Sequence, residues 1–145
     1  MFKKKNKKEE VFNHRKPKKC PICGNTFETW GNNPQPITSG LCCDNCNYKY
    51  VLPFRIFLSN NDKYLFIPVD FTDKLFKFDY EDIETDEVDF ICKHLDIKKE
   101  DLSIYYHKDL IFYSSKKRNL VNQVSSIIGN KILKGNVIIR RKGEI

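Results

Sequence analysis

The sequence contains no run of about 18 consecutive apolar residues, the length that a membrane-spanning helix requires. We therefore expect no segment that crosses a membrane, and no membrane partner. The start, Met1 to Lys5, carries charge, but no apolar segment follows it, so it does not have the pattern of a secretory signal. A cytoplasmic location is therefore expected, and disulfide bonds are not, because cytosolic thiols stay reduced.

Recognisable catalytic signatures are also missing from the sequence. It contains no phosphate-binding loop, no G-x-S-x-G and no H-E-x-x-H. Its three histidines are isolated, and the acids in residues 79–89 are typical of a solvated loop and helix start. Without paired groups for acid–base chemistry we do not expect an enzyme, although a site of unfamiliar pattern stays open as the weakest alternative.

Charge is present but unevenly distributed. The net charge is +7, and residues 1–19 alone hold nine Lys or Arg and two acids. Residues 70–101 hold twelve acids and five bases, whereas residues 108–142 hold nine bases and one acid. Residues 1–19 are expected to be a disordered basic tail, either a phosphate-seeking arm or a solubilising end. The candidate nucleic-acid-binding residues are Lys3, Lys4, Lys5, Lys7, Lys8, Arg15, Lys16, Lys18, Lys19, Arg140 and Arg141.

Four of the six cysteines form two short pairs. Two residues separate Cys20 from Cys23 and Cys43 from Cys46, and nineteen residues lie between the pairs. Two C-x-x-C pairs at this separation supply four thiolates that can surround one zinc ion tetrahedrally. Four protein ligands leave no position for water, so the metal is expected to hold the fold and not to do chemistry.

Several details of this site are open to choice. Cys42 adjoins Cys43, and we choose Cys43 as the ligand because its spacing repeats that of the first pair, with Cys42 a packing residue or a spare thiol. Gly24 and Asn47 follow the second cysteine of each pair and are expected to take a left-handed conformation. A rubredoxin-like iron site uses the same ligands, so zinc is preferred over iron but not proved.

The residues around the cysteines predict a zinc ribbon over residues 20–58. Residues 26–30 are expected to form a short strand, residues 31–36 a loop, and residues 48–52 the returning strand. Trp30 and Tyr48 could stack on bases, but in so small a module we favour a core role for both.

Three motifs of this segment occur together: CPICGNTFE at 20–28, GNNPQP at 31–36 and CCDNCN at 42–47, followed by Val51-Leu52-Pro53. Together they resemble small zinc-ribbon proteins that are common in bacteriophage genomes and largely uncharacterised. The resemblance covers roughly residues 19–58. It implies a metal site and a phage origin, hence the host cytoplasm, but no activity. Those proteins continue into a short helical tail, whereas this chain continues to residue 145, so a whole-protein function does not carry over.

Residues 62–145 are expected to form a second domain of α+β class. Their apolar periodicity predicts strands at 64–71 and 75–80, a helix from Thr85 or Asp86 to Leu95 with Cys92 on its apolar face, a hairpin of 102–106 and 110–114, a helix at 118–128 stopped by Gly129, and a strand at 136–141. The order β-α-β-β-α-β is that of the ferredoxin-like fold, with two helices on one sheet face. The open face of such sheets stacks bases in RRM domains, but residues 108–113 lack the RNP1 glycines.

These patterns predict one function and leave one alternative open. The first is a zinc-binding phage accessory protein that binds nucleic acid through its basic segments without catalysis. The alternative is a protein-binding phage factor that inhibits or redirects a host enzyme or defence system. Separated acidic and basic patches suit such a partner, and the acidic surface could mimic nucleic acid.

Overall fold

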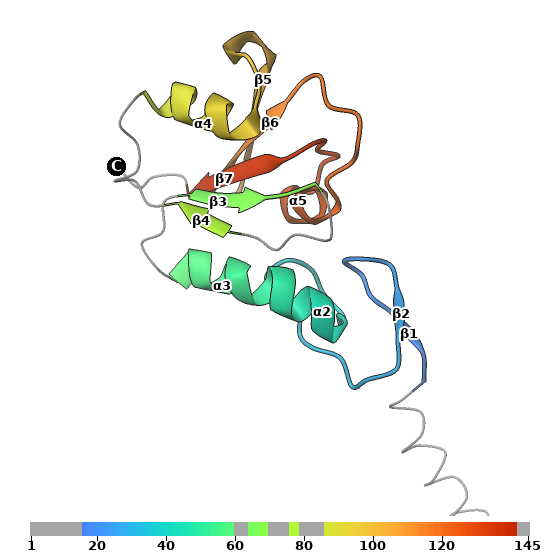
Figure 1. Ribbon diagram of the computed structural model, residues 1–145. Coiled ribbons are helices and arrows are strands. Elements are labelled where there is room, and N and C mark those ends of the chain that lie inside the picture. The colour runs from blue at the N-terminus through green and yellow to red at the C-terminus, as the bar shows by residue number, and fades with distance from the viewer. Residues whose placement is uncertain (1–15, 60–63, 70–75, 79–85, 142–145) are drawn as a thin grey trace, which may run out of the picture.

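The computed structural model describes residues 16–59, 64–69, 76–78 and 86–141. It is an α+β protein with two antiparallel sheets, as the sequence predicted. A five-stranded sheet forms the body of the C-terminal half, and a two-stranded sheet with a long helix forms the N-terminal half (Figure 1). None of the helices in the described ranges is long and apolar enough to cross a membrane.

The N-terminal half contains one short hairpin and one helix. Strands β1 (Lys18–Lys19) and β2 (Thr26–Phe27) pair antiparallel, which confirms a shorter form of the predicted strand at 26–30. Consecutive segments α2 (Asp44–Cys46), the π-helical η1 (Asn47–Val51) and α3 (Leu52–Ser59) make one helical rod.

The predicted returning strand at residues 48–52 is therefore wrong. Tyr50, Val51, Phe54 and Phe57 are all buried, and their three- to four-residue spacing gives the rod one apolar face. Helical conformation buries these side chains together, whereas a strand would send Tyr50 and Val51 to opposite faces. The second cysteine pair thus opens a helix, and the two-hairpin form of a zinc ribbon is not present in the described residues.

The C-terminal half contains the predicted strands and helices with changed bounds, and the predicted strands at 64–71 and 75–80 lie partly outside the described residues. Its elements are β3 (Tyr64–Ile67), β4 (Phe76–Phe78), α4 (Glu87–Leu95), η3 (Lys99–Asp101), β5 (Leu102–His107), β6 (Leu110–Ser115), α5 (Gln123–Gly129) and β7 (Val137–Arg141). The Asp86 side chain caps α4 by accepting a hydrogen bond from the Val88 amide, and Cys92 is buried on the predicted apolar face. Helix α5 begins at Gln123, later than predicted, and Asn130 rather than Gly129 supplies its left-handed end.

The ferredoxin-like arrangement is not confirmed. The strands lie in the order β4-β3-β7-β6-β5. A split βαβ unit places another strand between the two that its helix connects, but α5 connects β6 and β7, which are direct antiparallel neighbours. Helix α4 also covers one sheet face while α3 and α5 lie on the other, instead of both predicted helices sharing a face (Figure 1).

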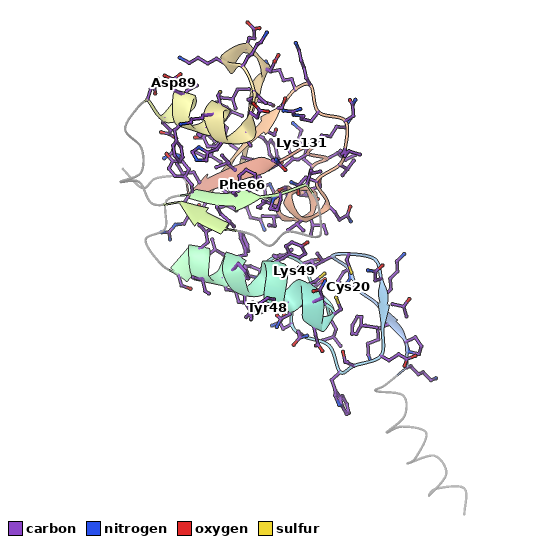
Figure 2. The ribbon with its side chains drawn as sticks, in the orientation of Figure 1. Cys20, Tyr48, Lys49, Phe66, Asp89 and Lys131 are labelled. Carbon is purple, nitrogen blue, oxygen red and sulfur yellow. The ribbon has the colours of Figure 1, made fainter. Side chains whose placement is uncertain are left out.

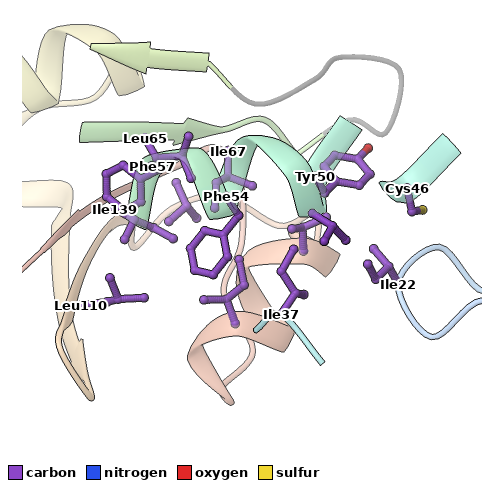
Figure 3. Packing of buried hydrophobic residues seen from close by; sticks show 14 of the residues in the cluster. Ile22, Ile37, Cys46, Tyr50, Phe54, Phe57, Leu65, Ile67, Leu110 and Ile139 are labelled. Carbon is purple, nitrogen blue, oxygen red and sulfur yellow. The ribbon is translucent and has the colours of Figure 1, made fainter. Parts of the chain in front are cut away.

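Alternating side chains give the five-stranded sheet two buried faces. On one face Leu65, Ile67 and Ile139 pack with Phe54 and Phe57 of α3 (Figure 3). On the other, Tyr64, Phe66, Ile111, Tyr113 and Ile138 pack against α4. The hairpin of β5 and β6 does not form the open base-stacking face of an RRM domain, because Phe112 and Tyr113 are buried, although Tyr106 on the edge strand β5 is 58% exposed.

The first of these clusters extends into the N-terminal half. Ile22, Ile37, Cys46 and Tyr50 belong to the same buried cluster as the sheet residues (Figure 3). The predicted division into residues 20–58 and 62–145 stays a prediction. The shared cluster means that the two segments bury apolar surface against each other.

Candidate metal centre

The four predicted ligands come together in space. The sulfurs of Cys20, Cys23, Cys43 and Cys46 all lie within 4.8 Å of one another, and those of Cys23 and Cys43 are 3.9 Å apart. Four sulfurs at about 2.3 Å from a tetrahedral zinc ion would be separated by about 3.8 Å. The four thiols are therefore positioned to hold one metal ion, and Cys42 does not belong to the group.

Backbone amides donate hydrogen bonds to three of the four sulfurs. The amides of Cys43, Asn25 and Cys46 donate to the sulfurs of Cys20, Cys23 and Cys43 at 3.5, 3.4 and 3.4 Å respectively. In the first pair the Gly24 amide closes the turn on the Cys20 carbonyl at 2.9 Å, with Gly24 at φ 79° as predicted. Asn47 is instead right-handed, at φ −59°, because the helix continues through it.

The surroundings of the cysteines shift their pKa values in opposite directions. Burial disfavours the Cys20 thiolate, but hydrogen bonds from the amides of Cys23, Cys43 and Ile22 outweigh it and lower the pKa of Cys20 to about 7. Burial raises the pKa of Cys23 and of Cys46. The cluster therefore combines Cys20, whose thiolate form is favoured, with Cys23 and Cys46, whose thiolate forms burial disfavours.

Cys42 has a packing role. Its side chain is fully buried, and burial raises its pKa to about 11. Its backbone pairs with Asn32 through hydrogen bonds of 2.9 and 3.0 Å, which tie the loop at 31–36 to the second cysteine pair. This matches the first of the two predicted roles for Cys42.

The predicted loop at 31–36 is held by one arginine of the long helix. Arg55 in α3 donates from Nε to the Gln35 carbonyl at 2.7 Å and from a terminal nitrogen to the Asn33 carbonyl at 2.6 Å. The Asn32 side chain donates to Asp44 at 2.8 Å. These contacts give the GNNPQP motif a structural role, because they fix the loop against the rod that carries Cys46.

Replacing Arg55 by alanine is expected to loosen this loop and lower stability by about 1–2 kcal/mol, since two charge-assisted hydrogen bonds are lost. Amide hydrogen exchange should rise in residues 32–38 and stay unchanged in α4. Arg118→Ala, which removes one exposed bond to the Asp96 carbonyl, is the matched control and should leave residues 32–38 unaffected. Equal exchange of residues 32–38 in both variants would contradict the role of Arg55 in holding this loop.

The candidate nucleic-acid-binding residues fall into three groups. Lys3 to Arg15 lie outside the described residues, and Lys16 and Lys19 are exposed. Lys18 lies over the Phe27 ring at 5.8 Å and also bonds to the Thr29 carbonyl. Arg140 and Arg141 make contacts within the protein. Arg140 contacts Glu87 at 3.0 Å and the Tyr113 hydroxyl at 3.3 Å, and Arg141 donates to the Leu58 carbonyl at 3.0 Å.

Trp30 and Tyr48 are not core residues. Their side chains are 57% and 60% exposed, so the prediction of a core role is wrong for both. The small module obtains its core from the sheet instead, through residues such as Ile22 and Tyr50. Tyr48 lies on the side of the rod that faces away from the sheet (Figure 2).

One residue that the sequence analysis did not identify lies beside the metal centre. Gln123, the first residue of α5, lines a surface hollow with Lys19, Cys20, Cys23 and Gly24. Only the fold brings α5 to the first cysteine pair, so no spacing in the sequence could have indicated this contact.

Comparison with protein-family models, with curated proteins and with solved structures finds no match to this chain. Functional conclusions therefore depend on the geometry of the cysteine cluster and of the surface around it.

Proposed function

We propose that the four cysteines hold one structural zinc ion and that the protein is a non-catalytic nucleic-acid-binding protein. Four thiolates complete a tetrahedral coordination sphere, so the ion would hold the fold without an open position for chemistry. Cys46 belongs to the main buried cluster, which supports a structural role for the ion.

The observation that carries nucleic-acid binding is the polarity of the surface. Lys16 and Lys19 are exposed beside the first cysteine pair, and Lys131 and Lys134 are exposed in the segment that follows α5. Exposed acids such as Asp86, Asp89 and Glu100 lie instead on α4 and η3, and α4 covers the sheet face opposite α5. Lysines beside the first cysteine pair and after α5 can attract a polyanion to that part of the surface, whereas Lys117 and Arg118 lie next to Asp101 and Asp96.

The test is the salt dependence of binding by the full chain to a labelled oligonucleotide, measured by fluorescence anisotropy. If about four lysines contact phosphates, affinity should fall about 50-fold between about 50 and 200 mM salt. Changing the basic residues of the tail to glutamine should lower affinity and reduce this slope. The residues to change are Lys3, Lys4, Lys5, Lys7, Lys8 and Arg15. Absence of binding at the lower salt concentration would refute the proposal.

A protein-binding phage factor is the second candidate function. Exposed Tyr48, Leu52 and Ile56 recur every four residues along the rod, as an apolar stripe that could receive a partner. The motif resemblance supports a phage origin and a host-cytoplasmic site of action. Capture of a discrete host protein by the full chain, surviving nuclease and lost in Leu52→Ser with Ile56→Ser, would favour this candidate over the first.

A further inference from the structure

Two neighbouring surface hollows run between the N-terminal half and α5. One is lined by Lys19, the first cysteine pair and Gln123. The other is lined by the loop at Ile37 and Thr38 and by residues of α5 and its end, namely Gln123, Ser126, Ile127, Asn130, Lys131 and Ile132. Gln123 borders both hollows, so they are neighbours, and we call the surface that the two make together, from the first cysteine pair to the end of α5, the groove.

The groove has the chemistry of a polyanion site. Lys19 lies at one end and Lys131 at the other, and none of the residues that line the two hollows is acidic. Between the lysines, Gln123 and Asn130 are exposed amides that can donate to phosphate oxygens or to base edges. Ser126 is already engaged, since its hydroxyl bonds to the carbonyl and the amide of Leu133.

Lys131 is held near the groove by an aromatic contact. Its ammonium nitrogen lies 4.6 Å from the centre of the Tyr105 ring, and the Tyr105 hydroxyl donates to the Gly129 carbonyl at 2.9 Å. This contact leaves Lys131 exposed while restricting where its charge can be. A pre-positioned cation loses less side-chain entropy when a phosphate binds.

Two loops lie together next to the end of α5. Val121 bridges to Lys134, and the Gly135 amide donates to the Leu120 carbonyl at 2.7 Å, so residues 120–122 and 133–135 lie together. Leu120 and Ile132 are 72% and 69% exposed. Exposed aliphatic side chains among lysines are suited to a ligand that offers both negative charge and apolar surface.

We propose that a single strand of nucleic acid lies along this groove, from Lys19 past Gln123 to Lys131 and Lys134, with Leu120 and Ile132 contacting bases. The proposal rests on the proposed nucleic-acid function and names the form of the ligand. A duplex encloses its base faces, so it would meet the lysines but leave the aliphatic side chains without an apolar partner. A single strand exposes phosphates and base faces together.

The experiment measures binding of the full zinc-loaded chain to a labelled single strand of about 12 nucleotides and to the duplex of the same sequence. Lys131→Glu and Lys134→Glu should each weaken single-strand binding about tenfold and reduce the salt slope by about 1. Lys93→Glu makes the same charge change on α4, on the opposite sheet face, and should have little effect. Leu120→Ser with Ile132→Ser should weaken single-strand binding and leave duplex binding unchanged.

The possible outcomes separate the groove from the general function. If the unaltered chain binds neither ligand, the proposed function itself fails. If it binds, but Lys131→Glu and Lys134→Glu behave like Lys93→Glu, the groove is not the site, although nucleic-acid binding stands. A preference for the duplex, or serine variants that keep full single-strand affinity, would overturn the single-strand assignment. Unchanged thermal unfolding of each variant shows that lost binding is not lost folding.

Discussion

Replacing Cys46 by serine is expected to remove the bound metal and to unfold at least residues 20–59. Metal binding in small thiolate modules contributes about 10–16 kcal/mol of apparent free energy, which equals or exceeds the total stability of a typical domain. Cys46 is also fully buried in the cluster that joins the two halves, so an uncoordinated polar group there has no solvent to hydrate it.

The measurement is elemental analysis of the purified variant together with circular dichroism during heating. The unaltered chain should carry one equivalent of zinc and Cys46→Ser none. Cys42→Ala is the matched control. Cys42 is as fully buried as Cys46 and adjoins the ligand Cys43, but its sulfur lies outside the cluster of four. This variant should keep a full equivalent of metal. A full equivalent retained by Cys46→Ser would refute the ligand assignment, and visible absorption from an iron–thiolate centre would refute zinc.

Removal of the metal should also destabilise the five-stranded sheet. Ile22, Cys46 and Tyr50 share one buried cluster with Leu65 and Phe112. Chelation is therefore expected to lower the unfolding temperature of the whole chain in a single transition. Two separate transitions, with the sheet unaffected, would instead support independent folding of residues 20–58 and 62–145.

The sequence predicted the cysteine cluster because its information is local. Two matched C-x-x-C pairs specify four ligands whatever the rest of the chain does, and Gly24 marks the turn of the first pair. The helix at 87–95 and the hairpin at 102–115 were predictable for the same reason, since periodicity and capping act over a few residues.

The prediction of a returning strand at 48–52 was wrong because five residues are too few to distinguish a strand period from a helix period. Tyr48, Tyr50 and Leu52 alternate with Lys49 and Val51, but the decisive apolar set extends to Phe54 and Phe57 at helical spacing. A longer window would have favoured the helix. The exposure of Trp30 and Tyr48 depends on which surface the sheet covers, and nothing local indicates that surface.

The ferredoxin-like strand order was not confirmed because the order of elements along a chain does not determine which strands pair in the sheet. One signal was available in β7, where Val137, Ile138 and Ile139 are consecutive apolar residues. Such a run is typical of a strand buried on both faces, and β7 is the central strand, paired with β3 and β6. Successive side chains of β7 alternate between the faces, so Val137 and Ile139 enter the cluster of α3 and α5, and Ile138 enters the cluster of α4.

Asn122 is the residue that local sequence reasoning missed most completely. Its side chain is 1% exposed, and its amide nitrogen donates to the Ile67 carbonyl at 2.9 Å and to the Gly135 carbonyl at 2.8 Å. Its amide oxygen caps α5 by accepting from the Ser125 amide at 3.1 Å. One side chain thus joins the end of β3, the start of α5 and the approach to β7.

Replacing Asn122 by alanine should cost about 4 kcal/mol, because it removes a helix cap and the two hydrogen bonds that the Asn122 amide donates to the carbonyls of Ile67 and Gly135. Asn122→Ser can keep the cap and should cost less, which separates the cap from the carbonyl contacts. Asn119→Ala, at an exposed position of the same loop, is the control and should stay within about 0.5 kcal/mol of the unaltered chain. Denaturant unfolding of the zinc-loaded proteins measures all three. If Asn122→Ala unfolds at the same midpoint as Asn119→Ala, the buried amide does not hold these elements together, and the position of α5 beside the metal centre must depend on apolar packing alone.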